Sequence, residues 1–188
     1  MLLAKGMRDL KLYSMLGLPT ETEADVRELI ALIFQIWDRM KKYGRARGAL
    51  GTLTVSVNPF VPKPATPLQW CAMAPPRIVK AKLHTLRQAI RHESHIHLKH
   101  ENLKHDYLEA ILARGDRRLR DFLLETHRQC GDWPRAARRL DFDAEAFVCT
   151  ELSQQAGRPW DFLASERQIQ RLHREHDRAL AVPGAAHC

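Results

Sequence analysis

The chain has 188 residues, the length of one ordinary domain or of a domain with a small addition, which excludes a large multidomain machine. Hydrophobic residues make up 45% of it and charged residues 28%, a composition that excludes a disordered or collagen-like protein. Its 30 Lys and Arg residues outnumber 22 Asp and Glu residues, and the formal net charge of +8 favours anionic partners such as phosphates, nucleotides or nucleic acids.

The first predicted strand covers residues 11–16, where apolar residues alternate with small or polar ones. Gly17-Leu18-Pro19 ends it, and Thr22 is placed to cap a following helix. Apolar residues recur at helical spacing from Val26 to Met40, so we expect an amphipathic helix that closes near Gly44.

A second strand is predicted over residues 52–58, where Leu53, Val55 and Val57 alternate with polar residues. Strand, long helix and strand in succession are typical of a parallel crossover, so the two strands are expected to lie side by side. Ligands of parallel sheets bind at the carboxyl ends of the strands. Segments 17–22 and 56–60 are therefore the predicted functional positions.

A loop stiffened by four prolines follows, from Pro59 to Pro67. The next helix is predicted from Pro76 to about Arg91, with apolar residues on one face. We expect four basic residues to fill its other face: Lys80, Lys82, Arg87 and Arg91.

Five histidines gather between residues 92 and 105. If residues 94–99 form a strand, His95, His97 and Lys99 share its solvated face, and a lysine among the ligands opposes metal binding. If they form a helix, no pair among His92, His95, His97 and His100 has the i, i+4 spacing. A solvated, histidine-rich edge is the expected structure.

The chain is predicted to be helical from Asn102 onward. Asp116 and Asp132 are placed to cap two further helices, and residues 142–155 are a candidate for another. Residues 157–163 are predicted to form a turn that anchors aromatic side chains, and residues 167–188 a charged, flexible tail.

Several features favour a cytoplasmic protein. The apolar stretch Leu29–Trp37 is far too short to span a membrane, and no signal peptide is recognised at the amino terminus. The four cysteines are scattered without a C-x-x-C pair, as expected of free thiols: Cys71, Cys130, Cys149 and Cys188.

Two long segments carry a family resemblance. Residues 11–26, KLYSMLGLPTETEADV, resemble the signature LYFMIGLPTETDEDV of radical S-adenosylmethionine proteins. Residues 56–70 resemble a more restricted pattern of the members that contain a cobalamin (B12)-binding domain. Residues 112–118, 131–133 and 159–161 also resemble the region that follows the barrel in that subfamily, so the resemblance covers roughly residues 8–163.

The resemblance implies an α/β fold, an incomplete (β/α) barrel fragment of parallel strands with a mainly helical carboxyl-terminal region. The expected division is residues 1–91 for the barrel portion, 92–166 for the helical domain and 167–188 for the tail. The implied cofactors are S-adenosylmethionine and a [4Fe-4S] cluster, with cobalamin left open. Carried over to this chain, the adenosylmethionine-pocket candidates are Gly17, Pro19, Thr20 and Glu21 on the first strand end and Ser56, Asn58, Pro59 and Phe60 on the second.

Two departures from the family pattern bear on function. Ala65 and Leu68 stand where the family usually has histidine and phenylalanine. The C-x-x-x-C-x-x-C motif that holds the cluster is absent, as are the earlier barrel strands. We therefore expect a carboxyl-terminal part of a radical enzyme that is inactive alone and needs a missing amino-terminal barrel half or a companion chain.

Two other functions stay open. One is a basic module that binds RNA or another polyanion through the residues of helix 76–91 or through Arg117, Arg118 and Arg120, although no recognised nucleic-acid motif is present. The other is a helical scaffold without a ligand, which leaves the rigid loop between Asn58 and Pro67 unexplained.

Overall fold

Strands β1 (Leu10–Leu16) and β2 (Leu53–Pro59) lie side by side and parallel in the computed structural model, which describes residues 3–181. The short strand β3 (Ile96–Lys99) joins the other edge of β2, also in parallel, so the strand order is β1-β2-β3. The pairing of the first two strands was predicted and is confirmed. Their carboxyl ends meet, with Met15 opposite Asn58 and Leu16 opposite Pro59.

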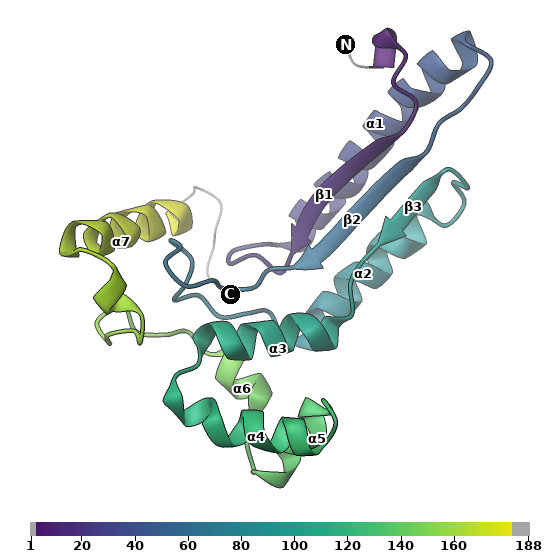
Figure 1. The fold of residues 1–188 in the computed structure, drawn as a ribbon. Helices are drawn as coiled ribbons and strands as arrows, with labels where there is room; N and C mark the ends of the chain where they lie inside the picture. Colours follow the sequence, from purple (N-terminus) through teal and green to yellow (C-terminus); the bar gives the residue numbers. More distant parts are fainter. Residues whose placement is uncertain (1–2, 182–188) are drawn as a thin grey trace. The chain divides into compact units, whose positions relative to one another are not determined.

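Two helices cover one face of this sheet, α1 (Glu23–Ala46) and α2 (Pro76–Ile90) (Figure 1). The buried side chains between sheet and helices are almost all apolar, as the two periodicities predicted. They include Leu16, Leu53, Val55 and Val57 from the strands and Val26, Ile33, Trp37, Val79 and Leu86 from the helices.

Helix α1 begins at the predicted cap but ends beyond the predicted glycine. Thr22 and Asp25 form a capping box, in which each side chain accepts a hydrogen bond from the other residue's backbone N–H. Gly44 lies inside the last turn, and a Cβ there would stand 2.9 Å from the Leu50 side chain. The glycine therefore permits the close approach of the following loop, and the helix continues to Ala46.

The second group of helices begins with α3 (Leu103–Arg114) and continues through α4 (Arg120–Arg128), α5 (Trp133–Arg139), α6 (Ala144–Cys149) and α7 (Glu166–Leu180). Short 3-10 turns lie at Leu3–Lys5, Arg117–Leu119 and Asp161–Leu163. A side chain caps the start of α3, of the turn Arg117–Leu119, of α5 and of α6. The capping residues are, in that order, Asn102, Asp116, Asp132 and Asp143. Their common core contains Met73, Tyr107, Ala110, Ile111, Leu119, Phe122, Ala137 and Val148.

Two carboxyl-terminal expectations differ from the structure. The helix predicted over 142–155 is confined to α6, because the chain then extends and the Leu152 N–H donates to the Trp70 carbonyl. Residues 167–180, expected within a flexible tail, belong to α7, which starts at a capping box of Ser165 and Gln168. The last part of the predicted tail, 182–188 with Cys188, lies outside the described residues.

The chain divides into two units, residues 1–59 with 76–101 and residues 60–75 with 102–188. This division differs from the expected boundary at residue 91, because β3 belongs to the sheet and the proline-rich loop belongs to the helical unit. The fold is thus mixed α/β, with a small parallel sheet and a mostly helical remainder. Among residues 3–181, no helix combines the length and apolarity that crossing a bilayer requires.

Candidate functional site

A tight turn follows β1 and contains three of the predicted site residues, and a fourth, Gly17, directly precedes it. The Glu21 N–H donates to the Leu18 carbonyl at 3.0 Å, with Pro19 in the second position of the turn and Thr20 in the third. Thr20 has φ +71°, in the left-handed region that β-branched residues avoid. Such a conformation costs about 1–3 kcal/mol and is concentrated at functional sites. Gly17, at φ +73°, adopts the same region without that penalty.

The Glu21 carboxylate is held inside this turn. The Gly17 N–H donates to both of its oxygens, at 3.0 and 3.1 Å, and the Lys82 ammonium lies 2.5 Å from Oε1. Both charged side chains are buried, 7% exposed for Glu21 and 6% for Lys82. Glu21 was predicted as a ligand contact. In the structure its carboxylate accepts these hydrogen bonds and fixes the turn against α2, and the residue also lines a cavity beside the turn.

Lys82 was predicted on the wrong face of α2, and it was not among the predicted site residues. It was expected on the solvated basic face of α2, but it is buried among the core residues of that helix. The signal was present in the spacing. Lys82 lies three residues after Val79 and four before Leu86, both of which belong to the apolar face.

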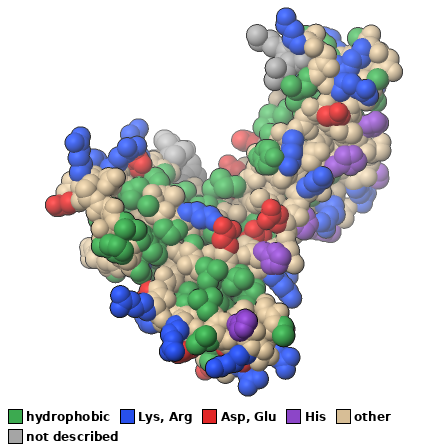
Figure 2. Space-filling model, in the orientation of Figure 1, with side chains coloured by type: hydrophobic (Ala, Val, Ile, Leu, Met, Phe, Trp, Pro, Cys, Tyr) green, Lys and Arg blue, Asp and Glu red, His purple; other side chains and the backbone are tan. Residues whose placement is uncertain are grey.

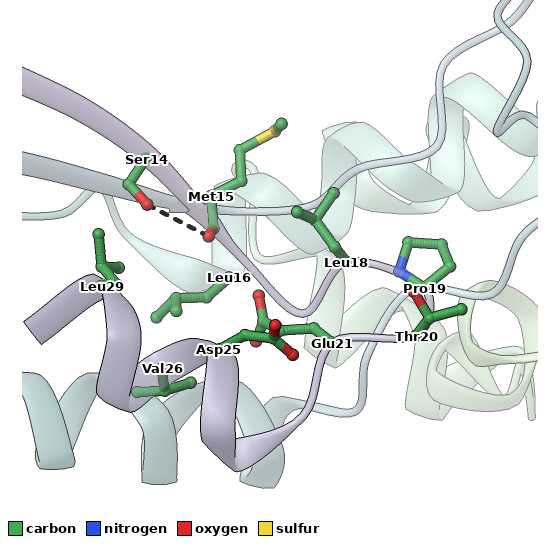
Figure 3. A pocket seen from close by; sticks show the side chains of 10 residues that line it. All are labelled: Ser14, Met15, Leu16, Leu18, Pro19, Thr20, Glu21, Asp25, Val26 and Leu29. Atoms are coloured by element: carbon green, nitrogen blue, oxygen red, sulfur yellow. Dashed lines mark hydrogen bonds between the residues drawn. The ribbon is translucent and has the colours of Figure 1, made fainter. Parts of the chain in front are cut away.

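The face of the sheet opposite α1 and α2 is not covered by a helix of its own unit (Figure 1). Ser56 and Asn58 belong to this open face, where they lie beside Tyr13 and Met15. Tyr13 is 70% exposed and Met15 52% exposed. Figure 3 shows Met15 and Leu16 directed to opposite sides of β1, with Leu16 toward α1.

Asn58 carries an unused hydrogen-bond acceptor at the end of β2. Its Oδ1 is buried and has no hydrogen-bond partner among the described residues. An unpaired buried carbonyl oxygen costs about 1–3 kcal/mol, so the site favours a donor from a ligand. Of the eight predicted residues, Asn58 has the most direct geometric support for binding.

A cavity of about 290 Å³ adjoins the turn, between the outer edge of β1 and the start of α1 (Figure 3). Pro19, Thr20 and Glu21 line it, together with Ser14 and Leu29. The four predicted residues of the second strand end do not line it. The strand tips are therefore neighbours in the sheet, but this cavity belongs to the first tip alone.

Pro59 and Phe60 offer little surface to a ligand. Pro59 is a buried residue of β2, and its register partner Leu16 is directed toward the helices. Phe60 is only 6% exposed, so little of its ring is free to flank a purine. The remaining open-face candidates are Ser56 and Asn58, both half-buried.

Cys71, Cys130 and Cys149, the cysteines within residues 3–181, do not form a site for an iron–sulfur cluster. Within residues 3–181, no three His, Cys, Asp or Glu side chains are grouped closely enough to hold a metal ion. Burial raises the pKa of the Cys71 and Cys149 thiols to about 11, so both are protonated at neutral pH in the chain as it stands. The described residues therefore do not fit the implied [4Fe-4S] cluster.

The basic and histidine side chains gather along the part of the first unit that contains β3 and α2 (Figure 2). His97 and Lys99 are exposed on β3, while His95 is half-buried and stacks on Trp37 with ring centroids 5.7 Å apart. The exposed Lys and Arg residues of α2 and its end are Arg77, Lys80, Arg87 and Arg91. His95 thus belongs in part to the packing of the sheet, not only to the solvated edge expected for it.

The comparisons with known proteins give one relative. No protein-family model and no solved structure matches the chain. The chain is similar to the uncharacterized protein MJ0966 of Methanocaldococcus jannaschii, with 33% identity over 118 residues. The match covers 63% of this chain but only 24% of the archaeal protein. The chain therefore spans about a quarter of the length of that relative.

Proposed function

We propose that this chain is the carboxyl-terminal part of a radical S-adenosylmethionine enzyme and contributes one wall of the adenosylmethionine pocket. The rest of the barrel, with the cluster motif, comes from a missing amino-terminal barrel half or from a companion polypeptide. The proposal rests on the two motif-bearing segments, 11–26 and 56–70, together with the positions of their strand ends.

The open face of the sheet is the observation that carries the proposal. Parallel sheets are normally covered on both faces, and their ligands bind at the carboxyl ends of the strands. Here one face has no covering helix of its own unit, and on it the half-buried polar residues Ser56 and Asn58 lie beside the exposed Tyr13 and Met15. Strand β1 also pairs on one side only, which leaves its outer edge for a further strand. A barrel in which this face looks inward accounts for both features.

The residues divide into those that contact the ligand and those that position them. Asn58 accepts a hydrogen bond from an amine or hydroxyl group of the ligand through its unpartnered Oδ1. Ser56, two residues earlier on the same face, adds a hydroxyl group, and Thr20 adds one from the turn after β1. Gly17, Glu21 and Lys82 fix the turn that carries Thr20. Bound adenosylmethionine would supply a 5′-deoxyadenosyl radical after reduction by a cluster held outside this chain.

Polyanion binding has less support as an alternative. One of the four basic residues assigned to that surface, Lys82, is buried in an ion pair with Glu21. Of the second proposed group, Arg118 is engaged with Asp116 at 2.8 Å. The remaining exposed charges resemble an ordinary solvated surface.

The test is production of 5′-deoxyadenosine by the assembled pair. The full chain is mixed with a companion that carries the C-x-x-x-C-x-x-C motif and has been reconstituted anaerobically with its cluster. We expect product from the pair and none from this chain alone. Asn58→Leu in the pair is expected to lower adenosylmethionine affinity about tenfold or more, the effect of losing a hydrogen bond and leaving a buried donor unpaired.

The matched control is Thr54→Val, a substitution on the same face of β2 but away from its carboxyl end, which should leave affinity unchanged. An assembled, cluster-loaded pair that forms no 5′-deoxyadenosine would reject the proposal.

A further inference from the structure

The helical unit contains a cavity of about 790 Å³ that the proposed function does not use. Two sequence segments separated by about 40 residues meet there, the end of α3 with the turn after it and residues 156–159. Helix α6 and the residue preceding it supply the other walls. The lining residues are Arg114, Asp116, Arg118, Phe142, Asp143, Ala146, Phe147, Thr150, Leu152, Ala156, Gly157, Arg158 and Pro159.

Arg114 is a buried cation at this cavity, with only 6% of its surface exposed. Its Nη1 donates to the Cys71 carbonyl at 2.7 Å and its Nη2 to the Thr150 carbonyl, while Nε has no partner among the described residues. No carboxylate within residues 3–181 forms an ion pair with it. Desolvation lowers the pKa of Arg114, as expected for a guanidinium that two neutral carbonyls compensate only in part.

Arg158 brings a second guanidinium to the same cavity. Its Nη2 donates to the Ser153 carbonyl at 2.5 Å, and its Nε is buried without a partner among the described residues. Arg114 and Arg158 both line this cavity, and the positive charge of Arg158 further lowers the pKa of Arg114. Two like charges at one half-enclosed site are stabilised by an anion between them.

The two carboxylates of the cavity wall are engaged elsewhere. Asp116 accepts hydrogen bonds from Arg118 Nε at 3.0 and 2.9 Å, and Arg118 is itself largely in solvent. Asp143 caps α6 by accepting from the Ala146 N–H at 2.9 Å. Neither therefore supplies the missing counter-charge for Arg114 and Arg158.

We propose that this cavity binds a small organic anion. Its carboxylate or phosphate group lies between Arg114 and Arg158, and its apolar body packs against Phe142 and Phe147. Guanidinium groups recognise both oxyanions through paired N–H donors, and aromatic side chains bind flat apolar groups. This site lies within the helical unit and does not depend on the proposed radical chemistry.

The experiment measures binding to the full chain by titration calorimetry. The probes are phenylphosphate, phenylacetate, inorganic phosphate and uncharged benzyl alcohol. We expect saturable binding of at least one aromatic anion, at least about tenfold tighter than benzyl alcohol or inorganic phosphate, which corresponds to one charge-assisted contact. The better of phenylphosphate and phenylacetate identifies the oxyanion. Absence of saturable binding by both, or equal binding of all four probes, would overturn the proposal.

Substitution locates the site. Arg158→Gln is expected to lower the affinity of the chain for the aromatic anion about tenfold. Arg138→Gln removes the same charge from an exposed position on α5 and should leave that affinity unchanged. Equal effects of the two substitutions would contradict the site.

If Arg158→Gln does not fold, the unmodified chain still provides the test through the side-chain Nε–H resonances of its arginines. The anion is expected to shift those of Arg114 and Arg158. Shifts confined to other arginines would place the ligand elsewhere and overturn the proposal.

Discussion

The residue with the largest structural consequence in the first unit is Lys82. It carries a positive charge into the core and meets a single carboxylate, that of Glu21, which is also bound by the Gly17 N–H. A buried ion pair of this kind adds little net stability over a well-packed apolar pair, but removing one partner leaves the other charge buried and uncompensated. The pair therefore makes the conformation of the turn depend on α2.

Lys82→Met is expected to destabilise the protein by about 3–5 kcal/mol, because the Glu21 carboxylate loses its counter-charge. Lys80→Met, an exposed position on the same helix, should change stability by less than about 0.5 kcal/mol. Denaturant unfolding measures both. The double variant Glu21→Gln with Lys82→Met should recover much of the loss, and strictly additive losses would show that the two side chains do not interact.

Thr20 is the second informative residue, because its backbone is strained where glycine would not be. Thr20→Gly is expected to raise the free energy of unfolding by about 1 kcal/mol. Glycine relieves the backbone strain of the folded state, but its greater conformational entropy in the unfolded chain offsets part of that gain. Thr22→Gly, two residues away at the helix cap, should instead lower stability by a few tenths of a kcal/mol. Thermal melts compare them. A lower melting temperature for Thr20→Gly would contradict the strain argument.

At the scale of elements, two carboxylates hold the ends of β1 and α1. Asp9 accepts hydrogen bonds from the Thr52 hydroxyl and N–H, and Asp25 accepts from the Thr22 hydroxyl and N–H. These hydrogen bonds hold the pKa of both carboxyls below the ordinary value of 3.8. Because the folded pKa is the lower one, the stabilisation is present above the unfolded pKa and is lost as the pH falls through the folded value.

The melting temperature is therefore expected to fall as the pH is lowered from about 5 to about 3, the range around the unfolded carboxyl pKa. Asp25→Asn should be less stable than the unmodified chain at pH 7 and lose less on acidification. Glu28→Gln, an exposed acid of the same helix, serves as the control and should keep the full pH dependence. An Asp25→Asn variant with an unchanged acid response would contradict the capping role.

The pairing of β1 with β2 begins at a close backbone approach. A Cβ at Gly51 would lie 1.8 Å from the Arg8 carbonyl oxygen, so any side chain there separates the two segments. Gly51→Ala is expected to cost about 1–3 kcal/mol in urea unfolding. The control is Gly157→Ala, where the nearest atom lies 3.9 Å from the added carbon and the change should stay within about 0.5 kcal/mol. Similar stability of the two variants would show that this approach is not tight.

Regular periodicity made the first two strands and the two covering helices predictable, whereas the pattern of residues 94–99 fits either a strand or a helix. The alternation in residues 11–16 and 52–58 and the apolar stripe from Val26 to Met40 each match one element in type and approximate range. The sequence predictions differed from the structure at residues whose conformation depends on tertiary packing and not on the sequence pattern. Gly44 permits a close approach instead of ending a helix, and the chain of α7 is helical because a capping box and a buried His176 hold it.

The candidate site was predictable in position but not in detail. Chain order and strand type are sufficient to bring the two strand tips together. The sequence does not specify that Glu21 turns back to Gly17 and Lys82, or that Asn58 is left with a free acceptor, because both depend on side-chain packing between distant segments.

At the scale of the whole molecule, the chain consists of a half-covered parallel sheet and a helical unit with its own core. The relative MJ0966 matches this chain over only 24% of its own length. Among residues 3–181, β1 pairs only with β2, and the sheet face opposite α1 and α2 has no covering helix of its own unit. The central proposal is that the open face at the carboxyl ends of β1 and β2 forms one wall of the adenosylmethionine pocket.

Photoaffinity labelling tests that claim most directly. The pair assembled from this chain and a cluster-bearing companion is illuminated with an azido-adenosine analogue of S-adenosylmethionine, and the labelled peptides are identified by mass spectrometry. We predict label on this chain within residues 13–21 and 56–60, suppressed by excess adenosylmethionine. Competable label found only on the companion, or only within residues 102–166, would contradict the account.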